Sequence, residues 1–153
     1  MWAGPAYFRA ELERRLAGYD SVLLLGDSMG GCAALLFAPL ATGVLCFTPQ
    51  VDVSDYPPVR RADFTPERRA QLPAGIRSGL TAAAEAGVPV TIHYGAGCTE
   101  DCAQLAHLDS SLAGLDLVPH DYAEHTLSIE LRRQGELVPL VQAAYDATRH
   151  AEG

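Results

Sequence analysis

The sequence contains no lysine, because all 11 of its basic residues are arginines. This absence excludes mechanisms that need a lysine amine, such as Schiff-base chemistry, a serine–lysine dyad or a phosphate-binding loop. Positive charge is scarce altogether, since 19 acidic residues give the chain a net charge of -8 at pH 7. We therefore expect neither nucleic acid nor an anionic membrane surface as a partner, because both bind clustered positive charge.

Long apolar runs are also missing. No run approaches the roughly 18–20 apolar residues that a membrane-spanning helix needs. The first residues, 1–5, lack the positive end and the apolar stretch of a secretory signal. These absences favour a cytoplasmic protein in a reducing compartment.

The four cysteines fall into two pairs. Cys32 and Cys46 lie within apolar segments, which predicts that both are small core residues. Cys98 and Cys102 are four residues apart near His107, a grouping that could bind a metal. A closed zinc site needs about four ligands, however, and a fourth is not apparent. We therefore predict no metal and no cofactor, and we do not favour a disulfide between Cys98 and Cys102.

What the sequence does contain is an alternation of short apolar runs and amphipathic helical patterns. We expect strands at 21–26, 43–48, 88–94 and 115–118, and helices at 7–17, 29–37, 75–86, 100–113, 124–133 and 136–150. Such alternation predicts a single α/β domain, 1–153, built as a three-layer sandwich with a short, mostly parallel sheet of about four strands flanked by helices. The continuous apolar run at 21–26 is typical of a strand buried on both faces. Residues 50–73 are rich in Pro, Asp and Arg and are interpreted as an insertion or a lid.

A Gly-x-Ser-x-Gly motif at 26–30 lies directly between the first strand and the helix that follows it. We expect Ser28 to occupy a sharp, strained turn that raises its hydroxyl above the edge of the sheet. Residues on either side of such a turn crowd each other, so glycine at Gly26 and Gly30 should remove a clash. Gly31 should let the helix pack closely. The amide of Met29, at the helix N-terminus, is expected to point at a developing oxyanion.

The segment Gly26-Asp27-Ser28-Met29-Gly30-Gly31 resembles the nucleophile elbow of the α/β-hydrolases. The resemblance implies a serine nucleophile, Ser28, followed along the chain by an acid and then by a histidine. The acid belongs in the loop after the strand at 88–94, where Asp101 is the first choice and Glu100 the second. Without a catalytic role, these carboxylates would be an ordinary helix start.

The histidine of the resembled family follows the last strand. His125 is the first choice, and His120 is the alternative, which is otherwise a strand-end histidine with a local hydrogen bond. His93 is expected to pack inside or at the edge of the sheet, and His107 and His150 to be exposed helix residues. The implied reaction is cleavage of an ester or thioester of a small acyl substrate through an acyl-enzyme, without a cofactor.

The sequence departs from the family before the elbow. Family members have several strands there, and one of their loops supplies a second oxyanion amide. In this sequence only about 20 residues precede the elbow strand. The chain therefore resembles the C-terminal half of the family's fold. Residues 2–4 are one hypothesis for the second amide. The open sheet edge should be covered by the N-terminal helix, by a second copy in a homodimer or by another partner.

The departure keeps a second function open. An active esterase or thioesterase is the first hypothesis, and a catalytically weak or inactive binding module of the same fold is the second. Acyl transfer to an acceptor other than water and a flavodoxin-like module are further alternatives. In the enzyme reading, an apolar acyl pocket would be walled by Val51, Tyr56, Val59 and Phe64.

Overall fold

The computed structural model describes residues 4–53 and 65–150. Its centre is a four-stranded sheet in which every neighbouring pair is parallel and the strand order follows the chain. The strands are β1 (Leu23–Asp27), β2 (Gly43–Phe47), β3 (Val90–Gly95) and β4 (Leu115–His120). The predicted class, an α/β three-layer sandwich with a sheet of about four strands, is confirmed, and the sheet is wholly parallel.

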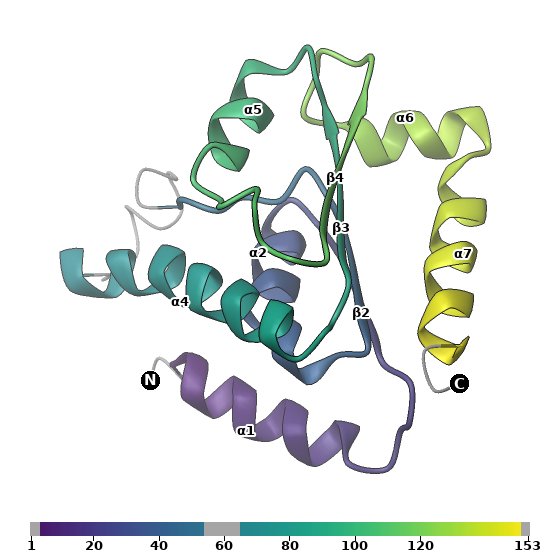
Figure 1. The fold of residues 1–153 in the computed structure, drawn as a ribbon. Helices are drawn as coiled ribbons and strands as arrows, with labels where there is room; N and C mark the ends of the chain where they lie inside the picture. Colours follow the sequence, from purple (N-terminus) through teal and green to yellow (C-terminus); the bar gives the residue numbers. More distant parts are fainter. Residues whose placement is uncertain (1–3, 54–64, 151–153) are drawn as a thin grey trace.

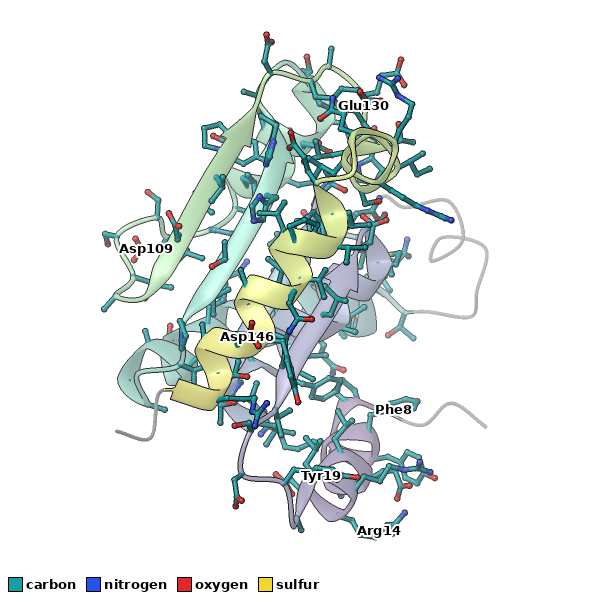
Figure 2. The ribbon with its side chains drawn as sticks, turned by 90° about the vertical axis from the view of Figure 1, so that its right-hand side faces the viewer. Phe8, Arg14, Tyr19, Asp109, Glu130 and Asp146 are labelled. Carbon is teal, nitrogen blue, oxygen red and sulfur yellow. The ribbon has the colours of Figure 1, made fainter. Side chains whose placement is uncertain are left out.

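Helices cover both faces of this sheet (Figure 1). On one side lie α1 (Pro5–Leu16), α2 (Met29–Leu36), the 3-10 helix η1 (Ala38–Leu40), α4 (Pro66–Glu85) and α5 (Thr99–Leu105). On the other side lie α6 (Leu127–Gln134) and α7 (Leu137–His150), with α7 running across the sheet (Figure 2). No helix of the described ranges, 4–53 and 65–150, is long and apolar enough to cross a membrane.

The sheet therefore has an apolar core on each face. The larger core joins β2 and β3 to α2 and α4, and includes Leu35, Val44, Cys46, Ile76 and Ile92. The smaller core joins β2 to α6 and includes Leu45, Phe47, Leu127 and Leu131, with α7 packed against it. Because successive side chains of a strand point to opposite faces, β2 contributes to both cores and all five of its residues are buried.

β1 does not have the two-sided burial that its apolar run predicts. Leu23 and Leu24 are only half-buried, and the Leu25 residue is 52% exposed. The reason is position, since β1 is an edge strand that pairs only with β2 among the described strands. Phe8 and Leu12 of α1 face Leu24 and Leu25 across an open apolar hollow of about 260 Å³, so α1 flanks this edge without filling the space beside it.

Figure 2 shows the α1 end of the molecule, where Phe8 and Tyr19 lie at the surface, opposite the end that carries Glu130 of α6. The carboxyl ends of the strands point towards this second end, where α5 and α6 begin (Figure 1). The loops that follow parallel strands meet at such an edge, and it is where ligands bind in open α/β sheets.

Two of the predicted boundaries are wrong by more than a helical turn. Residues 66–73, expected to be irregular, form the start of α4, which begins with Pro66 and continues through Pro73. Proline is well accommodated in a first helical turn, where its missing N–H has no helical acceptor anyway. The helix predicted at 100–113 ends at Leu105, and beyond it Asp109 accepts hydrogen bonds from the amide and hydroxyl of Ser111. Such a side-chain turn competes with helical hydrogen bonding.

Part of the predicted insertion lies outside the described residues. Residues 54–64 carry most of the lid hypothesis and the proposed pocket residues Tyr56, Val59 and Phe64. Val51, the remaining proposed pocket residue, is fully buried in the larger core. Trp2 and Ala3, proposed for the second oxyanion amide, are also outside the described ranges.

Candidate active site

Ser28 forms the corner between β1 and α2. Its backbone has φ of 51° and ψ of -114°, a region that non-glycine residues rarely enter. The corner is held from both sides, because the Ser28 amide donates to the carbonyl of Phe47 at 3.0 Å and its carbonyl accepts from Cys32 at 3.1 Å. The strained turn that the sequence predicts at Ser28 is therefore present.

The glycines around this corner have unequal roles. A Cβ at Gly26 would overlap the carbonyl of Gly30, which is the crowding that the motif predicts. A Cβ at Gly30, in contrast, would meet nothing within 4 Å, so the expected clash at that position is wrong. The second position without room is Gly31, where a Cβ would lie 2.8 Å from the Pro49 Cβ. The turn therefore needs glycine at 26 and 31, because Gly31 faces the segment that leaves β2.

A chain of hydrogen bonds connects Ser28 to two residues that are distant in sequence. The Ser28 Oγ lies 2.9 Å from Nε2 of His125, and Nδ1 of the same ring lies 2.7 Å from Oδ1 of Asp101. The Asp101 side chain is only 1% exposed, and the His125 side chain 29%. Asp101 also accepts a hydrogen bond from the Gly95 amide at 3.4 Å. The structure thus brings together the three first-choice residues in serine–histidine–carboxylate order.

The sequence alternatives lie elsewhere. Glu100 is exposed on the first turn of α5, whereas Asp101 on the same turn is buried. His120, at the end of β4, has its Nε2 2.8 Å from Nδ1 of His93. His93 is buried and stacks on Phe47, and burial together with the His120 ring lowers its pKa to about 4. Of the two remaining histidines, His107 is exposed in a turn after α5 rather than on a helix, and the side chain of His150 lies outside the described part of the chain.

An amide suited to an oxyanion lies next to the serine hydroxyl. Met29 is the first residue of α2, so its N–H has no acceptor within the helix. The positive end of the helix dipole adds to this local preference for negative charge. The Met29 amide therefore lies at the N-terminus of α2, directly after Ser28.

A second group of polar side chains surrounds the corner and was not found from the sequence. Thr48 follows β2 and lies 3.3 Å, through Oγ1, from both Asp27 Oδ1 and the His125 carbonyl oxygen. Asp27 Oδ2 accepts from the Ser128 hydroxyl of α6 at 2.8 Å. The available signal was that Asp27 and Thr48 each end a neighbouring strand, but nothing in the sequence connects them to Ser128.

Gln104 of α5 was also missed. Its side-chain oxygen accepts from the amides of Val51 and Asp52 at 2.7 and 2.8 Å, and its nitrogen donates to the Asp52 carbonyl at 3.2 Å. This one side chain therefore holds the segment that leaves β2 against the helix that carries Asp101. A glutamine in an amphipathic helix carries no sequence signal for such a role.

None of the four cysteine thiols belongs to the hydrogen-bonded chain of Ser28, His125 and Asp101. Cys32 and Cys46 are buried core residues as predicted, and burial raises the pKa of the Cys32 thiol to about 11. Cys98 is buried and Cys102 exposed, and both are free thiols. Within residues 4–53 and 65–150, no group of three or more His, Cys, Asp or Glu side chains is placed to hold a metal ion.

Comparison with known proteins adds no assignment to this geometry. The sequence matches no protein-family model and no curated protein.

Proposed function

We propose that this chain is a serine hydrolase of the α/β-hydrolase type, which cleaves an ester or thioester of a small acyl substrate through an acyl-enzyme. One observation carries the proposal: Ser28 Oγ, the His125 ring and the Asp101 carboxylate form a continuous hydrogen-bonded chain with contacts of 2.9 and 2.7 Å. A nucleophile, a base within hydrogen-bond reach and a group that orients the base are what acyl transfer by serine requires.

In the first half of the reaction, Ser28 Oγ attacks the substrate carbonyl carbon and its proton passes to His125 Nε2. Asp101 accepts the Nδ1–H bond, which keeps Nε2 free to act as the base and then stabilises the imidazolium. The tetrahedral oxyanion is stabilised by the Met29 amide at the start of α2. His125 then returns its proton to the leaving alcohol or thiol as the bond to the carbonyl carbon breaks.

The second half reverses these roles with water in place of the alcohol or thiol. His125 Nε2 takes a proton from water, and the hydroxide oxygen attacks the acyl carbon attached to Ser28. When the second tetrahedral intermediate collapses, the proton on His125 returns to Ser28 Oγ and the carboxylic acid leaves. The burial of Asp101 supports this cycle, because a carboxylate shielded from water holds one imidazole orientation throughout.

The test is labelling with a fluorophosphonate probe, in which Ser28 Oγ displaces fluoride from phosphorus. We expect the natural chain to be labelled and Ser28→Ala not to be. Ser21→Ala is the matched control, because it removes a serine hydroxyl whose bond, to the Thr148 carbonyl, lies far from the elbow. Asp101→Asn should lower the labelling rate about 10,000-fold, as loss of the orienting carboxylate does in other serine triads.

Hydrolysis of a p-nitrophenyl ester series of increasing chain length then measures which acyl groups are accepted. Labelling that survives Ser28→Ala contradicts the assignment of the nucleophile. A folded natural chain that is neither labelled nor able to hydrolyse any ester contradicts the enzyme proposal.

A second candidate is a catalytically weak module that binds a partner, and the exposure of β1 favours it. Leu25 lies half exposed on the open edge of the sheet, between apolar hollows of about 260 and 280 Å³. A partner or a second copy that covers this edge would bury apolar surface there. Absence of labelling together with a concentration-dependent increase in mass would support this function over hydrolysis.

A further inference from the structure

Two non-glycine residues among those described, Ser28 and Thr48, have positive φ angles. They lie side by side, because Asp27 pairs with Phe47 in the parallel register of β1 and β2, and each strained residue directly follows the end of its strand. Thr48 has φ of 42°, which is especially unfavourable for a β-branched side chain. Strain of this kind persists when the surrounding structure compels it, and it concentrates at functional sites.

In this strained conformation, Thr48 makes a specific set of contacts. Its residue is only 1% exposed, and its amide donates to the His93 carbonyl at 2.8 Å. Its hydroxyl lies 3.3 Å from Asp27 Oδ1 and also 3.3 Å from the carbonyl oxygen of His125. Both neighbours are acceptors and the hydroxyl has one proton, so the two long contacts describe a proton shared between them.

The same network continues into α6. Asp27, the residue before Ser28, accepts from the Ser128 hydroxyl at 2.8 Å through its second oxygen. Ser128 is three residues after His125 and lies in the first turn of α6, where a carboxylate such as Asp27 is favoured by the helix dipole. The His125 carbonyl and the first turn of the helix that follows it are therefore linked, through Thr48 and Ser128, to Asp27, the residue before Ser28.

We propose that Thr48 is a positioning residue, which with Asp27 and Ser128 sets the distance between the His125 ring and the Ser28 hydroxyl. The inference rests on the proposed hydrolase function. It adds a second set of contacts that positions the His125 ring, besides the contact with Asp101. Asp101 fixes the rotation of the imidazole from one side, whereas the Thr48 network fixes the backbone from which the imidazole projects. Glycine would relieve the strain at 48, but it has no hydroxyl to offer.

The experiment compares Thr48→Val, which keeps the shape and loses the hydroxyl, with Thr48→Ser, which keeps the hydroxyl. Thr42→Val is the matched control, because Thr42 precedes β2 as Thr48 follows it and bonds only to Val22 among the described residues. Fluorophosphonate labelling is measured over a range of probe concentrations, so that the maximal rate constant and the half-saturating concentration are obtained separately. Circular dichroism and urea unfolding establish that each variant is folded.

We expect Thr48→Val to lower the maximal labelling rate about fivefold to tenfold, the factor that an ordinary hydrogen bond represents, with the half-saturating concentration unchanged. Thr48→Ser should remain within about twofold of the natural chain, as should Thr42→Val. Ser128→Ala, a change near the surface that leaves the cores intact, should lower the maximal rate in the same direction and by a smaller factor.

The outcomes separate this inference from the proposed function. If the natural chain is labelled at Ser28 but Thr48→Val and Ser128→Ala label at its rate, the positioning role is wrong and the hydrolase proposal stands. A rise in half-saturating concentration without a fall in the maximal rate also contradicts positioning. If the natural chain is not labelled, the hydrolase proposal itself fails. Should Thr48→Val not fold, Ser128→Ala decides the matter: a lower maximal rate supports the positioning role, and labelling at the natural rate contradicts it.

Discussion

β1 and β2 are neighbouring strands with similar apolar sequences, yet they are buried to very different extents. β2 is buried along its whole length, and Leu45 at its centre is only 2% exposed. Leu25, its direct partner in β1, is 52% exposed. β2 lies between two strands and between two layers of helices, whereas β1 has a strand on one side only in the described part of the chain. The comparison teaches that an apolar run identifies a strand but not its place in the sheet.

β1 nevertheless ends in a tightly constrained corner. Its one fully buried residue is Gly26, which lies against the backbone of Gly30. The edge strand is therefore loosely packed along its length and tightly packed where it meets α2. This gradient predicts that substitutions in β1 have very unequal effects.

The largest effect is expected for Gly26→Ala. The added Cβ would overlap the Gly30 carbonyl, which is backbone and cannot rotate away. We expect a loss of about 4 kcal/mol or more in the free energy of unfolding, or failure to fold, since overpacking against backbone ranks among the most severe substitutions. Urea unfolding measures the first outcome and soluble yield the second.

Gly30→Ala is the matched control for this change. A Cβ there meets nothing within 4 Å, and alanine is a better helix former than glycine by about 1 kcal/mol. Stability should therefore stay the same or increase slightly. Equal damage from the two substitutions would show that the elbow is not packed as described.

The next largest difference is expected between alanine substitutions of the paired leucines Leu45 and Leu25. Leu45→Ala should lower the free energy of unfolding by about 2–5 kcal/mol, because it leaves a cavity in a closed core. Leu25→Ala should cost about 1 kcal/mol or less, since half of that residue is already in water. Urea unfolding at several protein concentrations measures both. Similar large losses, or a Leu25→Ala loss that depends on concentration, would show that β1 is covered in solution.

A smaller, pH-dependent effect concerns His93, which stacks on Phe47 of β2. Burial, and then the ring of His120, lower the pKa of His93 from 6.5 to about 4, while Asp116 acts in the opposite direction. The unfolded chain takes up this proton near pH 6.5, so the folded state loses stability as pH falls from about 6.5 to about 4. The loss is at most about 3 kcal/mol, at about 1.4 kcal/mol for each pKa unit.

His93→Gln removes this titration and keeps a polar side chain beside His120. Its urea unfolding free energy should therefore depend less on pH than that of the natural chain across this window. Parallel curves for the two proteins would show that His93 is not the group responsible.

Much of the fold followed from local patterns. The helix at 29–37 and the strand at 43–48 were predicted almost to the residue, because apolar periodicity reports which side chains are buried. The end of α5 was missed, since Asp109 and Ser111 form a turn within a stretch that reads as helical. The start of α4 was missed because proline was taken as a sign of irregular structure, although Pro66 lies at a helix start where it is tolerated.

The candidate site, like the fold, was predicted from the sequence only in part. Ser28, Asp101 and His125 were chosen from a motif and from the order of residues along the chain, and the structure places them in hydrogen-bond contact. Thr48 was not chosen, because a threonine with positive φ is contrary to the local preference of that residue type. Its conformation is imposed by the strands and loops that meet around it.

By itself, the sequence determined the alternation of strands and helices, the parallel sheet and the corner at Ser28, because these depend on residues close together in the chain. Tertiary structure alone decided that β1 is an exposed edge and that Asp101 rather than Glu100 is buried against His125. It also decided that Asp27, Thr48 and Ser128 form one network. These features depend on which distant segments come into contact, and no local pattern of residues records that.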